Sequence, residues 1–160
     1  MQINSLFVPI LNKIDFIKRY KDLSIQFNYE LKESFEDYSR ESALEIIKEF
    51  GYTVSYNKKE NFYKIIERVE NYKFQFNIVL KYGIVELIWT VWEDNELLQI
   101  GGPWGMIKYL LDFNEEDKVK LPVFRNYEDL KEILMQAFSI YEDFKKEVLK
   151  SFNKGNKNII

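Results

Sequence analysis

Two neighbouring runs of alternating residues constrain the fold of this chain more than any other feature. Between residues 72 and 80, aromatic and aliphatic side chains stand at every second position. The same alternation returns between Ile84 and Trp92, after a break at Tyr82-Gly83. A period of two predicts strands with one buried face, and a glycine-containing dipeptide between two such runs predicts a tight hairpin. The middle of the chain is therefore expected to form an antiparallel sheet.

Two-residue turns at residues 82–83 and 94–95 would set the register of this sheet. The register then pairs residues across the strands as follows: Lys73 with Trp92, Trp92 with Leu97, and Thr90 with Gln99. A slip of one residue would turn every side chain to the other face. The face toward the core is predicted to carry Phe74, Phe76, Ile78, Leu80, Val85, Leu87, Trp89, Val91, Leu98 and Ile100.

Helices are expected before the sheet. Apolar residues at helical spacing predict helices over residues 10–20 and 43–50. Ser39 suits the N-cap of the second helix, and Gly51 suits the position after its C-terminus. Between the two helices, the alternation over residues 23–31 predicts a further strand.

Further strands are predicted on both sides of the hairpin. Residues 52–56 alternate in the same way, and residues 96–100 follow the second turn. Phe62–Val69 fits a strand or a helix, and its short length and its neighbours favour a strand. The Gly-Gly-Pro-Trp-Gly segment at residues 101–105 then leads into a short helix that reaches Leu111.

The last element is a long amphipathic helix over residues 127–152, because apolar residues recur three and four positions apart. Asn126 suits its N-cap, and the helix is expected to pack on the core face of the sheet. Residues 153–160 are expected to form a disordered tail. The whole pattern predicts one α+β domain over residues 1–152: a mainly antiparallel meander sheet of five to six strands, flanked by N-terminal helices and a long C-terminal helix.

Composition excludes several kinds of active site. The 160 residues contain no histidine and no cysteine. This excludes Ser-His-Asp and Cys-His nucleophiles, disulfides, and zinc sites built on imidazole or thiolate. Glu86 lies inside an otherwise apolar strand, and a general base there would need a second carboxylate or a proton relay, neither of which the sequence supplies. We therefore expect no enzymatic activity, no cofactor and no metal.

Charge is distributed unevenly. The net charge is −3, from 23 basic and 26 acidic residues, and such a balance argues against a nucleic-acid partner. Residues 28–49 hold seven acidic residues against three basic ones. This run is either a solvated helix face or a docking surface for a basic partner, where complementary charge would speed association.

Neither an export signal nor a membrane span is visible in the sequence. Met1–Pro9 lacks the basic start of a signal peptide. No apolar run approaches the roughly 18 residues that a spanning helix needs. We expect a cytoplasmic protein that does not bind membranes.

A family resemblance follows from the second half of the chain. The hairpin sheet, the Gly-Gly-Pro-Trp-Gly loop and the closing helix that opens Asn126-Tyr127-Glu128-Asp129-Leu130 together resemble the immunity proteins of bacterial polymorphic-toxin and contact-dependent inhibition systems. The resemblance covers about residues 70–150. It implies a non-catalytic inhibitor that occludes the active site of a toxin through an acidic and aromatic surface.

Aromatic residues make up 17% of the chain, more than the predicted core positions require, so some are expected on a contact surface. The residues predicted to bind a basic toxin domain are Glu30, Glu33, Glu36, Asp37, Glu41, Glu45, Trp92 and Trp104. For Trp104, a position inside the core is the alternative. Two other functions stay open: a structural or regulatory adaptor that forms a homodimer through the C-terminal helix, and, third in order, a carboxylate-based hydrolase that uses Glu86.

Overall fold

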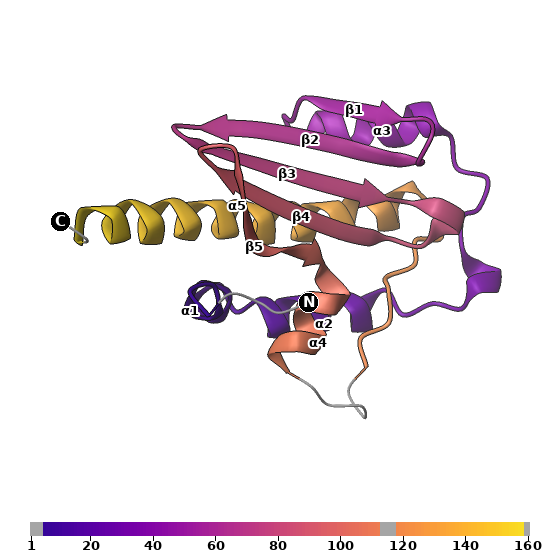
Figure 1. Ribbon diagram of the computed structural model, residues 1–160. Coiled ribbons are helices and arrows are strands. Elements are labelled where there is room, and N and C mark those ends of the chain that lie inside the picture. The colour runs from indigo at the N-terminus through magenta and orange to yellow at the C-terminus, as the bar shows by residue number, and fades with distance from the viewer. Residues whose placement is uncertain (1–4, 113–117, 159–160) are drawn as a thin grey trace.

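The central sheet consists of antiparallel strands that pair in chain order (Figure 1). The computed structural model describes residues 5–112 and 118–158. Within these ranges it describes every side chain except those of residues 99, 100 and 153–158. The strands are β1 (Val54–Asn57), β2 (Phe62–Val69), β3 (Tyr72–Val79), β4 (Glu86–Glu93) and β5 (Glu96–Pro103). The predicted α+β class and antiparallel meander are confirmed, and the ambiguous segment is the strand β2.

The register predicted for the β3–β4 hairpin is correct. Lys73 lies opposite Trp92, and Trp92 lies opposite Leu97. The connection from β3 to β4 is not the predicted two-residue turn but a short 3-10 helix, η2 (Lys81–Gly83), in which Tyr82 has a left-handed backbone conformation. Leu98 is only partly buried, and the side chain of Ile100 lies outside the described residues. The remaining predicted core residues are buried: Phe74, Phe76, Ile78, Leu80, Val85, Leu87, Trp89 and Val91.

Along β5 the predicted register holds as far as the pair of Val91 with Leu98 and then shifts at a β-bulge. Trp89 lies opposite Gly102 instead of residue 100, and the pairing of Thr90 with Gln99 stays a prediction. A Cβ on Gly101 would lie 2.6 Å from the carbonyl oxygen of Trp89, which is closer than any side chain tolerates. Only glycine therefore allows β5 to approach β4 this closely, as is typical at a bulge.

The helices are α1 (Val8–Lys13), α2 (Phe16–Gln26), α3 (Arg40–Glu49), α4 (Trp104–Leu111) and α5 (Tyr127–Asn158), with a further 3-10 turn, η1 (Leu31–Glu33). α3 and α5 have the predicted caps. The backbone N–H of Ser42 donates to Ser39 Oγ at 3.2 Å, and that of Asp129 donates to Asn126 Oδ1 at 2.8 Å. α5 continues to Asn158, past the predicted end at residue 152.

The predicted strand over residues 23–31 is wrong, because the chain there first completes α2 and then turns into η1. Tyr20, Leu23 and Phe27 are buried at helical spacing, whereas Ile25 is 70% exposed. The alternation is therefore a coincidence, and the helical set of apolar residues decides the structure. The single helix predicted over residues 10–20 is also divided in two, at Asp15, which has a left-handed backbone conformation.

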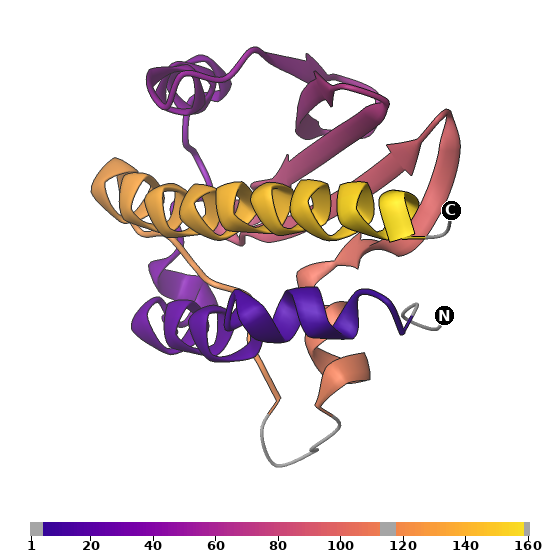
Figure 2. The ribbon, with the colours of Figure 1, turned by 90° about the vertical axis from the view of Figure 1, so that its left-hand side faces the viewer.

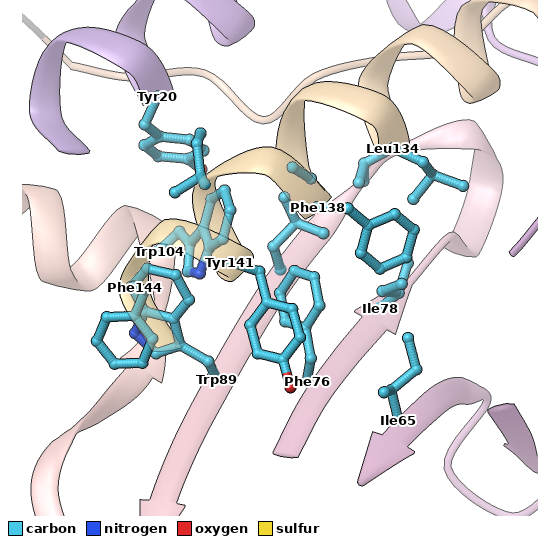
Figure 3. Packing of buried hydrophobic residues seen from close by; sticks show 14 of the residues in the cluster. Tyr20, Ile65, Phe76, Ile78, Trp89, Trp104, Leu134, Phe138, Tyr141 and Phe144 are labelled. Carbon is cyan, nitrogen blue, oxygen red and sulfur yellow. The ribbon is translucent and has the colours of Figure 1, made fainter. Parts of the chain in front are cut away.

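The helices lie on one side of the sheet. α5 crosses behind the strands in Figure 1, and Figure 2 shows α1 and α2 beneath it in the same layer. The core fills the space between α5 and the predicted face of the sheet. Figure 3 shows Trp89, Trp104 and Phe144 packed together there; the rings of Trp89 and Phe144 stack with centroids 3.9 Å apart. The other face of the sheet, toward the viewer in Figure 1, carries no helix among the described residues; we call it the open face.

Candidate functional site

A groove runs between α3 and the first turns of α5. It consists of two adjoining hollows of about 270 and 320 Å³, which share Glu49 and Lys131. The first is also lined by Phe50, Glu128, Glu132 and Met135, and the second by Glu41, Ser42, Glu45, Ile46 and Tyr127. The groove therefore has apolar side chains in its lining and carboxylates from both helices.

The amphipathic patterns of the two helices produce this arrangement. In α3, Ala43, Ile46 and Ile47 are buried, so the acidic residues four apart on the other side face outward. In α5, Leu130 and Leu134 are buried in the same way. Met135 is 57% exposed at the groove and is available for contact with another molecule.

The electrostatics of the groove are dominated by negative charge. Its lining contains one cationic side chain, Lys131, besides the carboxylates Glu41, Glu45, Glu49, Glu128 and Glu132. Lys48 approaches the outer side of Glu45, with the charged atoms 3.7 Å apart. An exposed carboxylate rim around an apolar patch attracts cationic groups and can desolvate an aliphatic side chain. The groove is therefore suited to binding a cationic group together with an aliphatic side chain.

The structure brings some of the predicted acidic residues to this groove and leaves others beside it. Glu41 and Glu45 line the groove. Glu30 and Glu33 form a capping box at the start of η1, in which the N–H of Glu30 donates to the Glu33 carboxylate at 3.0 Å. Glu36 and Asp37 are exposed in the loop that follows.

That loop lies close to the groove. The ring of Phe35 packs against the ring of Tyr127, with centroids 4.9 Å apart, and Tyr127 is itself part of the groove lining. Figure 2 shows η1, α3 and the beginning of α5 at the same end of the molecule. The acidic loop and the groove can therefore contact one partner.

Sequence reasoning missed the contribution of α5 to this site. Glu128, Glu132 and Met135 lie some 80 or more residues from α3 in the sequence, and only the packing of α5 brings them beside it. The helical repeat of α5 does indicate that these residues face outward. Nothing in the sequence, however, indicates which other helix they adjoin.

The two predicted tryptophans do not belong to this site. Trp104 is 0% exposed and packs against Phe16, Phe76 and Trp89, so its prediction as a contact residue is wrong. It is the first residue of α4, which follows β5 directly. Trp92 is partly exposed, but it lies on the open face of the sheet, away from the α3–α5 groove.

No protein-family model, no curated protein and no solved structure matches this chain. Among the described residues, no helix has the length and hydropathy that crossing a bilayer requires. In the same part of the chain, no three acidic side chains are grouped so that they could hold a metal ion. The site must therefore be interpreted from its own residues.

A second polar cluster connects β2 to α5 beneath the sheet. The Glu67 carboxylate accepts hydrogen bonds from Tyr141 at 2.8 Å and from Lys145 at 2.7 Å. Tyr52 donates to Glu142 at 3.1 Å, and Lys145 also pairs with Glu142. Burial and the adjacent carboxylates raise the pKa of both tyrosines. This cluster is satisfied by its own members, so its role is to fix α5 on the sheet.

Proposed function

We propose that this protein is a non-catalytic, protein-binding inhibitor that holds a basic partner in the groove between α3 and α5. The observation that carries the proposal is the composition of the groove: carboxylates from two helices surround the exposed side chain of Met135. A cationic protein surface with one protruding aliphatic side chain is complementary to it in both charge and polarity.

The form of inhibition that agrees best with these features is that of an immunity protein. Such a protein neutralises a toxin of its own bacterium by covering the toxin's active site. A nuclease-like toxin is basic around its active site because it binds phosphates, and a groove with a carboxylate rim competes for the same cationic groups. The absence of histidine and cysteine from the chain supports a role that needs no nucleophile. Under this proposal the protein acts in the cytoplasm.

The adaptor that dimerises through the C-terminal helix is less well supported. The apolar seam of α5 is buried in the protein's own core, where Leu134, Tyr141 and Phe144 are 0% exposed. A dimer would therefore have to use the polar outer side of this helix. The hydrolase alternative has weaker support still, because Glu86 lies on the open face of the sheet and does not line the α3–α5 groove.

The experiment that tests the proposal measures protection and binding together. The chain is expressed in cells that carry the candidate toxin encoded beside its gene, and the purified pair is titrated by calorimetry. Reversing two groove charges, Glu45→Lys with Glu132→Lys, is expected to abolish protection and to weaken binding at least about a hundredfold.

The matched control is Glu60→Lys, which reverses an exposed acid in the β1–β2 turn, outside the groove. It should protect as well as the unaltered chain does. Full protection by the groove variant, or a neighbouring gene product that the chain does not bind, would contradict the proposal.

A further inference from the structure

The open face of the sheet carries a basic patch on β2 and β3. Every ionisable side chain on this face of the two strands is cationic: Lys64 and Arg68 on β2, and Lys73 on β3. Among the residues that the structure describes, neither Lys64 nor Arg68 takes part in an ion pair. These two charges are therefore not used to stabilise the fold.

The pairing within the patch works against stability. Arg68 lies directly opposite Lys73 across the β2–β3 ladder. Like charges at directly opposed positions destabilise a sheet. Glu70 and Asp94, in the neighbouring hairpin turns, line one hollow together with Arg68 and Lys73 at the end of the patch, whereas Lys64 lies outside that hollow. An anionic group placed above the patch would relieve the repulsion between Arg68 and Lys73.

Apolar side chains accompany these charges. Ile66 stands between Lys64 and Arg68 on the same side of β2 and is 38% exposed. Farther across the sheet, Trp92 and then Leu97 continue the row that begins with Arg68 and Lys73. A rigid surface that mixes aliphatic, aromatic and cationic groups has the character of a protein-recognition face.

We propose that the open face docks an acidic, extended protein segment. Lys64 and Arg68 are four residues apart on one strand, which places them about 13 Å apart. An extended partner meets both when it carries carboxylates at positions i and i+4, and an aliphatic residue at i+2 then reaches Ile66. This site takes a partner of the opposite charge from the one proposed for the groove, and it is built from other residues.

A protein segment fits this face better than a single-stranded nucleic acid does. Binding of nucleic-acid strands relies on aromatic rings that stack on the bases. The Lys73 ammonium lies 3.9 Å from the centroid of the Trp92 ring and covers the ring face that a base would need. The patch therefore retains positive charge but has no free stacking platform at Trp92.

The test is a titration followed by NMR of the ¹⁵N-labelled full chain. The probe is the capped heptapeptide Ser-Glu-Ser-Leu-Ser-Glu-Ser, and the comparison peptide has glutamine in place of both glutamates. The acidic peptide is expected to shift the amide signals of β2 and β3 in a saturable way that weakens with salt. Lys64→Glu with Arg68→Glu is expected to weaken its binding at least about tenfold.

A matched variant with two reversed charges on α5, Lys146→Glu with Lys150→Glu, should bind the acidic peptide as the unaltered chain does. Unshifted β2 and β3 signals, equal binding of the glutamine peptide, or tighter binding of a ten-residue oligothymidylate would each overturn the proposal. Because the variants leave the α3–α5 groove intact, a negative result here does not bear on the inhibitor function.

Discussion

The two faces of the sheet are built from alternate residues of the same strands, yet they differ in burial and polarity. On the helix-covered face of β3 and β4, side chains such as Phe76, Trp89 and Val91 are no more than 1% exposed. On the open face the neighbouring residues are partly exposed and include two amides, the hydroxyl of Thr90 and the ammonium of Lys73. The covered face holds apolar side chains that gain from burial and close packing, whereas the open face holds polar groups whose burial would cost free energy. Equivalent substitutions on the two faces should therefore differ in their effect on the free energy of unfolding.

The largest difference between the two faces is expected when one tryptophan on each face is replaced by alanine. Trp89→Ala removes a ring stacked on Phe144 at the centre of the core, and we expect it to lower the free energy of unfolding by about 3–5 kcal/mol. Trp92→Ala on the open face should lower it by less than about 1 kcal/mol. Urea denaturation followed by circular dichroism measures both. Equal losses would show that the open face is covered in the folded protein.

A smaller effect is expected where β5 passes close to β4. Gly101→Ala places a methyl group 2.6 Å from the Trp89 carbonyl oxygen, so the bulge must shift, and we expect a loss of about 1–3 kcal/mol. Gly105→Ala is the control, because its new methyl group would meet nothing nearer than the Tyr20 hydroxyl at 3.8 Å. Thermal unfolding of the two variants distinguishes them. If both melt alike, the close contact between β4 and β5 does not exist.

The core between the covered face and the helices is also expected to respond to high pH. Burial raises the pKa of Tyr20 and Tyr141, and it raises the pKa of Tyr72 to about 12. These tyrosines ionise at lower pH in the unfolded chain than in the folded one. Their stabilising contribution is therefore complete below about pH 10, and it is lost as the pH rises toward the folded-state values.

The measurement is the free energy of unfolding in urea between pH 8 and about pH 11. Each tyrosine that ionises only in the unfolded chain contributes a slope of up to about 1.4 kcal/mol per pH unit. Tyr20→Phe should reduce the total slope above pH 10 without changing its sign. A free energy that stays constant in this range would mean that these hydroxyls reach solvent in the folded protein.

The difference in polarity between the two faces also determines how much of the structure the sequence predicts. Local alternation sufficed for the β3–β4 register, because one residue of slip would bury Lys73 and expose Phe74. Local alternation failed over residues 23–31, because apolar residues at alternate positions overlap there with apolar residues at helical spacing. Burial against distant elements decides that this segment continues α2. The bulge at Gly101 depends on the approach of two backbones, and hydropathy does not encode such an approach.

The candidate site shows the same division. Glu41 and Glu45 could be selected from a local charge run, and they do line the groove. Glu128 and Met135 could not, because their role exists only where α5 lies beside α3. The prediction for Trp104 is wrong, since a tryptophan that follows Gly101-Gly102-Pro103 can face either way until β5 is placed. Sequence patterns thus identify the elements and their polarity, while the surface they form together depends on tertiary packing.

The smallest predicted effect has the opposite sign from the others. Arg68→Gln removes the like-charge contact with Lys73, so we expect the free energy of unfolding to rise by about 0.2–0.5 kcal/mol at low salt. The gain should shrink as salt screens the repulsion. Lys64→Gln is the control, because Lys64 lies opposite the neutral Asn77 and should leave stability nearly unchanged. Chemical denaturation at two salt concentrations resolves the difference. A loss of stability in Arg68→Gln would mean that the folded protein itself uses the Arg68 charge, and the open face would then no longer contrast with the covered one at this position.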